Sequence, residues 1–420
     1  MIDKDFDLTR RSFIDHVLKA SAGAGMAAAA PWAAFAAGTE PLATDRVRLG
    51  VIGTGDRGRT LIRNIAKTRN CVVAALCDDY APHLARARAL VDPATPVFAD
   101  HRAMLDAGGL DAVVVATPLH VHARHTLDAF DAGLHVWCEK AMARTIADCS
   151  LMVKRAQDSR KVLQIGHQRM FNPTYLNALR RVKAGEIGPL IQIRASWHRN
   201  NSWRRPVPAD SNDRRINWRL YRESSAGLMT ELATHQLQIA SWFLDAAPTR
   251  VIGSGSLCFW KDGREVYDHV ALVYEYSGGR KLVWTSLLNN ARYGCEEQIQ
   301  GSKGTIEPEL GRIFKENPPG VRALRQMTQD IKDGQKRPVP IGGATWFPEL
   351  PVTTPGESLG WGEFDETMLQ FEAFGEAVRS GKPLPGLLHQ AYLASVASLM
   401  GEQAMDSGRP VDWPSALVNV

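Results

Sequence analysis

Residues 47–78 constrain the fold of this chain more than any other segment. An apolar strand at 47–52 runs into the turn Gly-Thr-Gly-Asp-Arg-Gly at 53–58, and a second apolar strand at 72–77 ends on Asp78. A glycine-rich turn between a strand and a helix, with an acid about twenty residues further on, is typical of dinucleotide-binding folds. The segment therefore predicts a site for the two phosphates of a dinucleotide.

The residues of this turn have separate roles. Gly53 allows the tight turn, Gly55 lets the backbone approach a pyrophosphate, and Gly58 lets the helix sit close to the strand. The helix that starts beside Asp56 and Arg57 presents free N–H groups and its positive dipole end to the phosphates. All five residues are predicted to bind the cofactor.

The charge of Asp78 indicates whether NAD or NADP is the cofactor. A carboxylate accepts hydrogen bonds from a ribose 2′-hydroxyl and repels a 2′-phosphate, and Asp79 adds to that repulsion. Arg57 and Arg59 would weaken the repulsion. We expect NAD, with NADP as the less favoured cofactor.

Strands and helices continue to alternate up to residue 166. The fully apolar runs at 112–116 and 134–138 are typical of strands buried on both faces. We therefore expect a doubly wound parallel sheet, a Rossmann domain, over residues 45–166, with its ligand crevice at the carboxyl ends of the strands. The residues predicted there, beside the cofactor, are Thr117, Pro118, His122, Glu139 and Lys140.

The pattern changes after about residue 187, where strands become longer and alternate between apolar and polar residues. Residues 270–276 and 281–287 flank a Ser-Gly-Gly turn and predict an antiparallel hairpin. We expect an α+β domain over residues 167–420, with a large, mainly antiparallel sheet of about five strands. One face of the sheet would be open and the other covered by helices. The two closing helices could pack back on the first domain.

Composition excludes several classes of function. The formal net charge of +5 over 420 residues is too small to indicate binding to nucleic acid or to a membrane surface. The six cysteines show no metal-ligand spacing such as C-x-x-C and no disulfide framework. We predict no metal site, and unpaired cysteines that act as small buried hydrophobic residues.

Residues 1–37 resemble a twin-arginine export signal. Arg10 and Arg11 precede Ser12 and Phe13, and a weakly apolar run rich in Ala and Gly follows up to Ala37. The run is too weakly apolar for a stable membrane span. We expect a periplasmic or otherwise exported protein. An amphipathic helix or a disordered tail is the alternative for this segment.

Several motifs together resemble the Gfo/Idh/MocA oxidoreductases, and their shared order is more specific than any one of them. Besides the glycine turn and Asp78, they are Ala116-Thr117-Pro118 with His122, Cys138-Glu139-Lys140, Gly166-His167-Gln168-Arg169, Glu231 with His235, and residues 301–307. The resemblance covers most of the chain from about residue 45 onward. It implies a nicotinamide cofactor, a sugar- or polyol-like substrate, hydride transfer over the open sheet, and a homo-dimer or tetramer. The chain departs from the family at Ala141, usually proline, and at Glu231, usually aspartate.

Lys140, Glu231 and His235 are the predicted catalytic residues. Lys140 ends a buried strand at the crevice, where its ammonium group can bond and acidify a substrate hydroxyl; an ion pair with Glu139 is the alternative. The resemblance places the general base at His235, for which a packed core histidine is the alternative. Glu231 lies one turn earlier on the same predicted helix, so its carboxylate would orient the imidazole and raise its basicity.

Residues 197–222 are rich in Trp, Arg, Asn and His. Aromatic faces stack on sugar rings, and the polar groups bond sugar hydroxyls. An oligomer contact and a basic nucleic-acid loop are the alternatives for this segment. The predicted substrate residues are Arg169, Tyr175, His198, Arg199, Asn200 and Trp218.

Three functions fit these residues. The first is a sugar, polyol or glycoside dehydrogenase. The second is a redox-neutral glycosidase, which oxidises a glycoside, eliminates the aglycone and reduces the ring again. The third is a nucleotide-binding sensor without catalysis. Because an exported enzyme has no ready supply of NAD, we expect a tightly held cofactor in either enzyme.

Overall fold

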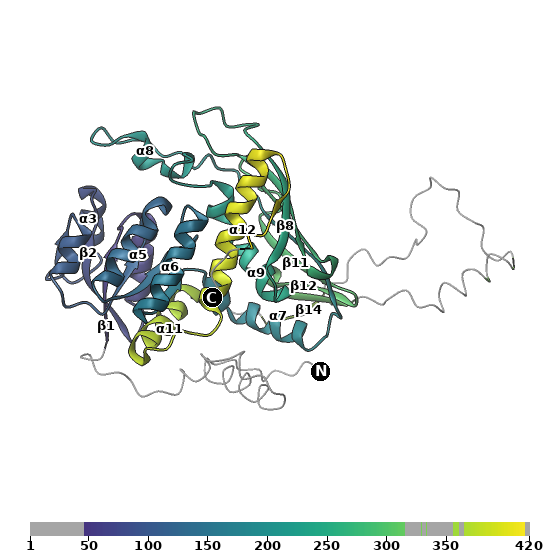
Figure 1. Cartoon of the computed structure of the whole chain (residues 1–420), viewed down its shortest axis with the longest axis horizontal. Coiled ribbons are helices and arrows are strands. Elements are labelled where there is room, and N and C mark those ends of the chain that lie inside the picture. Colours follow the sequence, from purple (N-terminus) through teal and green to yellow (C-terminus); the bar gives the residue numbers. More distant parts are fainter. Residues whose placement is uncertain (1–45, 316–328, 330–332, 334–355, 361–364, 416–420) are drawn as a thin grey trace, which may run out of the picture.

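The computed structural model describes residues 46–315, 329, 333, 356–360 and 365–415 (Figure 1). A parallel six-stranded sheet is followed by a mixed, mostly antiparallel sheet of nine strands. The fold class predicted from the sequence is therefore confirmed. The segment predicted to be an export signal, residues 1–37, lies outside the described residues.

The first domain is a parallel sheet between helices, with the strand order β3-β2-β1-β4-β5-β6. Its strands are β1 (Val47–Ile52), β2 (Cys71–Cys77), β3 (Val97–Phe98), β4 (Ala112–Val115), β5 (His135–Cys138) and β6 (Leu163–Ile165). Its helices are α2 (Asp56–Ile65), α3 (Ala81–Arg88), α4 (His101–Asp106), α5 (His122–Asp131) and α6 (Ile146–Ser159). All four side chains of β4 are buried, because this apolar strand is covered on both faces.

The strand order places the ligand crevice. β1 lies between β2 and β4, so the chain leaves β1 toward one edge of the sheet and leaves β4 toward the other. Open α/β sheets bind ligands at this switch point, outside the carboxyl ends of the strands. Gly53 and Glu139 directly follow β1 and β5, and Thr117 lies just beyond β4.

The second domain is built on a sheet with the order β14-β13-β12-β11-β7-β10-β9-β8-β15. Its strands are β7 (Leu190–Trp197), β8 (Pro248–Ser256), β9 (His269–Tyr276), β10 (Lys281–Leu287), β11 (Cys295–Gly301), β12 (Gly304–Glu307), β13 (Arg312–Lys315), β14 (Glu357–Ser358) and β15 (Val411–Asp412). β10 pairs parallel with β7, and the other pairs are antiparallel. The prediction of about five strands was too low, because β12 to β15 are too short to show an alternating pattern.

Helices cover one face of this sheet. They include α9 (Thr234–Leu244) and α12 (Leu387–Ser407), which pack on each other and, in the case of α12, on β8 (Figure 1). On the opposite face, Ile252, Val273 and Val283 form a row across three paired strands. Ile252 is 44% exposed, so this row is not covered within the described chain.

Helix α11 (Glu366–Ser380) returns to the first domain, where it contacts α2, β1 and β2. Phe371 and Phe374 belong to the same buried cluster as Leu49 and Leu61. The first domain thus takes part of its core from the end of the chain.

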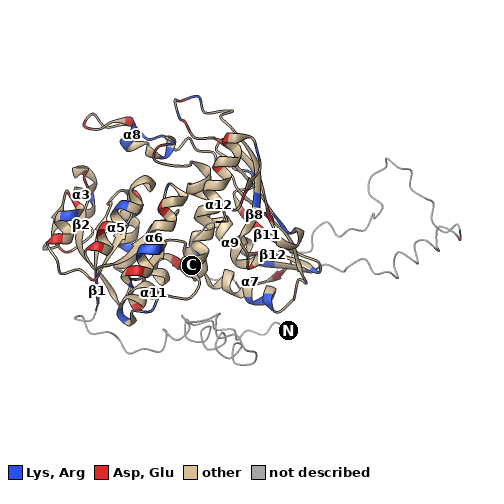
Figure 2. Cartoon of the chain, viewed as in Figure 1, with Lys and Arg blue, Asp and Glu red and all other residues tan. Residues whose placement is uncertain are grey.

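Charged residues of both signs are mixed over both domains (Figure 2). Among the described residues, no helix is long and apolar enough to cross a membrane. All six cysteines are unpaired, and Cys71, Cys77, Cys138 and Cys149 are buried as expected. The expectation of burial is wrong for Cys258, which is exposed in the loop after β8, and Cys295 is only half-buried.

Candidate active site

A cleft of ≈ 850 Å³ lies between the two domains. The first domain lines it with the residues that follow its strands, and the second domain lines it from β7, the loop after β7 and the segment before α9. Predicted cofactor and catalytic residues that line the cleft are Gly53, Gly55, Asp56, Arg57, Asp78, Thr117, Pro118, His122, Glu139, Lys140, Glu231 and His235. Gly58 lies one turn into α2, behind this wall.

The glycine turn fits a pyrophosphate. A Cβ atom on Gly58 would lie 2.1 Å from the carbonyl oxygen of Gly53, so only glycine lets α2 pack this closely on β1. Gly53 has φ +91°, a left-handed conformation suited to glycine. No side chain caps the N-terminus of α2 at Gly55. The first N–H groups of α2 therefore remain available to phosphate oxygens.

Asp78 lies at the end of β2 with its carboxylate held in place. It accepts hydrogen bonds from the backbone N (2.6 Å) and Oγ1 (3.1 Å) of Thr54 and from the backbone N of Tyr80 (2.9 Å). Burial alone would raise the pKa of Asp78, but His83, Thr54 and Tyr80 together lower it. Asp78 is therefore an ionised acceptor at the position where the family fold places a ribose.

His122 joins the loops that follow β4 and β5. Its Nδ1 lies 3.0 Å from the carbonyl oxygen of Ala141, and its Nε2 lies 3.0 Å from that of Thr117. Burial lowers the pKa of His122, although both carbonyl groups oppose the shift. His122 thus fixes the shape of the crevice beside Thr117 and Pro118.

Lys140 does not form an ion pair with Glu139, which was the alternative to a catalytic role for this lysine. Its Nζ donates to the backbone carbonyl oxygens of Glu231 (2.8 Å) and Thr230 (3.5 Å). Glu139 instead pairs with Arg57, whose Nε lies 2.6 Å from its Oε1. Burial lowers the pKa of Lys140, although Glu231 and Glu139 oppose the shift. The ammonium group is thus held between the domains, inside the cleft.

Glu231 and His235 lie where a π-helical turn, Met229–Ala233, passes into α9. The structure differs from the expectation that the carboxylate orients the imidazole. Glu231 Oε2 accepts from Arg219 Nε (2.8 Å), and Oε1 accepts from Ser225 Oγ (3.1 Å). Burial alone would raise the pKa of Glu231, but Arg219 and Lys140 lower it.

His235 faces the cleft as a neutral imidazole. Burial, and then the nearby charges of Lys140 and Arg169, lower the pKa of His235 well below its ordinary value. The expected rise in basicity is therefore wrong. Two rings support the imidazole: Trp197 at 5.4 Å and His167 at 5.9 Å between ring centroids.

His167 and Trp197 are functional candidates that were not among the predicted site residues. His167 follows β6, and its Nε2 lies 2.9 Å from Thr234 Oγ1 on α9. Burial lowers the pKa of His167 to about 3, so it is a neutral support behind His235. The signals in the sequence were the place of His167 in the motif Gly166–Arg169 at a strand end, and that of Trp197 at the start of the polar segment 197–222.

The predicted substrate residues divide into two groups. Arg199 and Trp218 line the cleft. The Arg199 guanidinium lies 5.2 Å from the ring centroid of Trp197. His198 and Asn200 do not line it: His198 Nε2 lies 3.1 Å from Thr285 Oγ1, and Asn200 forms an isolated β-bridge with Asn289.

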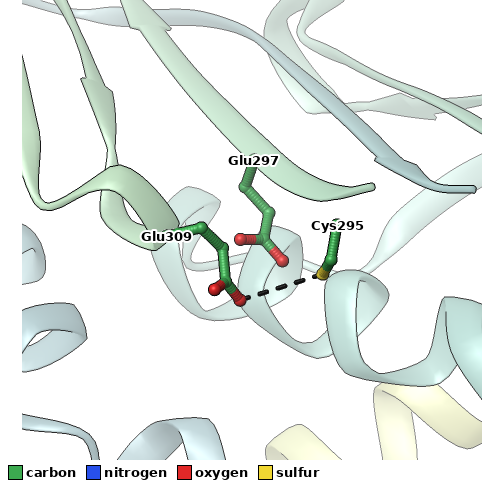
Figure 3. Close-up of side chains that lie close together, drawn as sticks. All are labelled: Cys295, Glu297 and Glu309. Atoms are coloured by element: carbon green, nitrogen blue, oxygen red, sulfur yellow. Dashed lines mark hydrogen bonds between the residues drawn. The ribbon is translucent and has the colours of Figure 1, made fainter. Parts of the chain in front are cut away.

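Arg169 and Tyr175 also lie outside the cleft lining, and both side chains are buried in a polar cluster. Arg169 donates to Glu297 (2.5 Å) and Glu309 (2.5 Å), and Tyr175 Oη donates to the same carboxylates at 2.6 and 2.8 Å. Figure 3 shows the two carboxylates beside Cys295, and the three side chains bring their ligand atoms within 4.8 Å of one another. Because the Arg169 guanidinium also bonds the Cys295 sulfur (2.9 Å), this space already holds a cation.

Comparisons with known proteins agree with this geometry. The family model "Oxidoreductase family, NAD-binding Rossmann fold" matches residues 47–167, and "GFO/IDH/MocA C-terminal domain" matches residues 175–307. Inositol 2-dehydrogenase 1 of Saccharopolyspora erythraea is 30% identical over 274 residues, covering 63% of this chain and 74% of that protein. Inositol 2-dehydrogenase 3 of the same organism is 27% identical over 348 residues, covering 81% and 95%.

Solved structures show the same fold. Levoglucosan dehydrogenase in complex with NADH and levoglucosan has a TM-score of 0.67 at 19% identity and covers 88% of this chain and 100% of its own. Aldose-aldose oxidoreductase from Caulobacter crescentus has a TM-score of 0.66 at 19% identity, with the same coverage. This chain therefore belongs to the Gfo/Idh/MocA family of oxidoreductases, and its first domain is an NAD-binding Rossmann domain.

Proposed function

We propose that this protein transfers hydride between a carbinol carbon of a sugar, polyol or glycoside and a tightly held NAD. One observation carries the proposal: the glycine turn and His235 line a single cleft, one from each domain. The names of the similar dehydrogenases support a sugar or polyol substrate. When bound, NAD supplies the hydride acceptor.

His235 is the proposed general base. Oxidation of a hydroxyl requires a group that takes the hydroxyl proton while hydride leaves the carbon. The lowered pKa of His235 keeps its imidazole neutral and ready to accept that proton near pH 7. Trp197 and His167 pack around the ring and hold its orientation.

Lys140 is the proposed partner of the substrate hydroxyl. Its ammonium group is anchored by the carbonyl oxygens of Glu231 and Thr230, which leaves its third N–H donor for a substrate oxygen. A cation beside that oxygen stabilises the negative charge that develops as the proton leaves. Arg199 and Trp218, on the second domain's side of the cleft, are the proposed contacts to the rest of the sugar.

The charge of Asp78 favours NAD over NADP. Its ionised carboxylate suits a ribose 2′-hydroxyl and repels a 2′-phosphate. Mass spectrometry of the nucleotide that the purified protein releases on denaturation tests this preference, because NADP as the released species would contradict it.

The activity is tested with the purified protein and a panel of sugars, polyols and glycosides. A substrate should raise the near-ultraviolet absorbance of reduced nicotinamide. His235→Gln should lower the rate of this change about 10²- to 10⁴-fold, the usual contribution of a general base, with little change in nucleotide affinity. His269→Gln, on the exposed sheet face, is the matched control. A wild-type rate in His235→Gln would exclude this histidine as the base.

The same assay separates the other functions. A redox-neutral glycosidase would release an aglycone with no net change of the cofactor. A sensor would retain nucleotide and show neither response. The dehydrogenase is favoured, because several similar curated proteins are named inositol 2-dehydrogenases.

We further propose that residues 1–37 direct export by the twin-arginine route. This would explain a need for a retained cofactor. Arg10→Lys together with Arg11→Lys should leave the protein in the cytoplasm in a cell fractionation. Unchanged export of this variant would contradict the proposal.

The open sheet face is the proposed contact between subunits of a homo-dimer or tetramer. Ile252, Val273 and Val283 present a row of apolar side chains there. Val273→Asp should shift the mass measured by light scattering toward the monomer. A wild-type protein that is monomeric at micromolar concentration would contradict the assembly.

A further inference from the structure

A segment of the second domain crosses over the nucleotide crevice. Residues 203–219, which we call the strap, follow β7 and include α8 (Asp213–Ile216). Figure 1 shows the segment that carries α8 reaching from the second domain over the first domain, where α8 lies above α3 and α5 in this view. Its arginines Arg205 and Arg215 line the same cleft as Gly55 and Asp78.

One contact joins the strap to the glycine turn. Arg205 Nη1 lies 2.5 Å from Asp56 Oδ2, and Asp56 is the first residue of α2. Burial alone would raise the pKa of Asp56, but Arg205 and Arg59 lower it. This end of the strap therefore lies beside the place where the pyrophosphate binds.

Three contacts join the strap to the far end of the site, just after Asp78. Arg215 Nη2 lies 2.6 Å from Asp79 Oδ1, and the Arg215 guanidinium lies 5.4 Å from the ring centroid of Tyr80. Tyr80 Oη donates to Asp210 Oδ1 at 2.9 Å. The strap thus spans the cofactor site from the glycine turn at 53–58 to Asp78.

The strap is a built structure rather than a loose loop. Asn217 forms two hydrogen bonds with the backbone of Arg205, at 2.7 and 3.0 Å. Arg204 Nη1 lies 2.7 Å from Asp213, and its Nε lies 3.1 Å from Asp262 on the second domain. These bonds join the two arms of the strap and fix its base on the second domain.

We infer that the strap is the outer wall of the cofactor site, and that bound NAD leaves only when the Arg205–Asp56 and Arg215–Asp79 ion pairs open. The inference rests on the proposed function, because it requires NAD to bind in this cleft. Both pairs are partly exposed to solvent, with side chains 39–81% exposed, so salt screens them. Release of the cofactor should therefore accelerate as ionic strength rises.

The test measures the dissociation rate of NADH, from its fluorescence, after a chase with excess NAD. Arg205→Ala together with Arg215→Ala should release NADH about two- to thirtyfold faster than the wild type, the range expected for two exposed ion pairs. Arg250→Ala is the matched control, because Arg250 forms an exposed ion pair with Asp412 and does not line the cleft. The control should release NADH at the wild-type rate.

Two further measurements separate the outcomes. Raising the salt concentration should accelerate NADH release from the wild type and have little effect on the double variant. The measurement on the wild type is informative by itself, because it does not depend on the folding of a variant. If NADH binds, but the double variant releases it at the wild-type rate and salt has no effect, the inference about the strap is overturned and the proposed function is not. A wild-type protein that binds neither NAD nor NADP would overturn the proposed function as well.

Discussion

Glu231 is paired with Arg219 and not with His235, although Glu231 and His235 lie four residues apart. The Arg219 Nε to Glu231 Oε2 distance is 2.8 Å. Arg219 ends the strap, so the carboxylate links the strap to the segment that carries the base. The Glu231 backbone carbonyl meanwhile holds Lys140. Glu231 therefore positions two cations rather than the imidazole.

Neutralising Glu231 should disturb both cations. In Glu231→Gln, Arg219 and Lys140 lose their shared counter-charge in a buried site. We expect kcat/KM to fall about ten- to hundredfold, since hydrogen bonds to charged groups contribute about 1.5–3 kcal/mol. Glu231→Asp keeps the charge and should lose less. Steady-state kinetics on the substrate found in the absorbance assay check this, and equal rates for the wild type and Glu231→Gln would contradict it.

The pH profile of kcat/KM should be shifted toward acid on both sides. The pKa of His235 is lowered from 6.5 by burial, so the base loses activity by protonation only well below pH 6.5. The pKa of Lys140 is lowered from 10.5 by burial, so the alkaline limb should begin below pH 10.5. An acid limb at or above pH 6.5 would show that His235 is not the base.

Two glycines of the phosphate turn should respond differently to alanine. A Cβ on Gly55 lies 3.6 Å or more from its nearest non-adjacent neighbour, His83, so Gly55→Ala should fold normally but obstruct the pyrophosphate and lose NAD affinity. A Cβ on Gly58 lies 2.1 Å from the Gly53 carbonyl oxygen, so Gly58→Ala should also lower Tm. Thermal unfolding and NADH titration measure both effects. Full NAD affinity in Gly55→Ala would place the pyrophosphate elsewhere.

Arg169 should matter more for stability than an exposed arginine. Its removal in Arg169→Met leaves Glu297, which is 0% exposed, without its buried counter-charge, at a cost of about 3–5 kcal/mol in the free energy of unfolding. Arg250→Met removes the exposed pair with Asp412 and should cost about 1 kcal/mol or less. Urea unfolding monitored by circular dichroism compares them, and equal midpoints would contradict the prediction.

Local patterns were enough to predict the fold class and to place the principal residues of the crevice. The glycine turn and Asp78 directly follow strands of the parallel sheet, and Lys140 is the second residue after β5. The carboxyl ends of these strands meet at one edge of the sheet. The ion pair of the Glu231 carboxylate could not be predicted from local sequence, because its partner Arg219 comes from a separate segment. The contacts of Arg205 and Arg215 with the first domain depend on tertiary structure in the same way.

The alternation of an extended chain explains which substrate residues were misplaced. Trp197 ends β7 and lines the cleft, and Arg199, two residues later, lines it as well. His198 and Asn200 have the opposite parity and turn to Thr285 and Asn289. A sequence rich in polar residues does not show where this extended segment ends, so His198, Arg199 and Asn200 were all predicted to contact the substrate.

Helix α11 has a consequence for how this chain is made. Phe371 and Phe374 complete a core whose other members, such as Leu49 and Leu61, leave the ribosome far earlier. Until α11 has been synthesised, the first domain exposes apolar residues that α11 later covers. Exposed apolar surface of this kind is prone to aggregation and is bound by chaperones. Synthesis must therefore have reached at least Phe374 before this core can close.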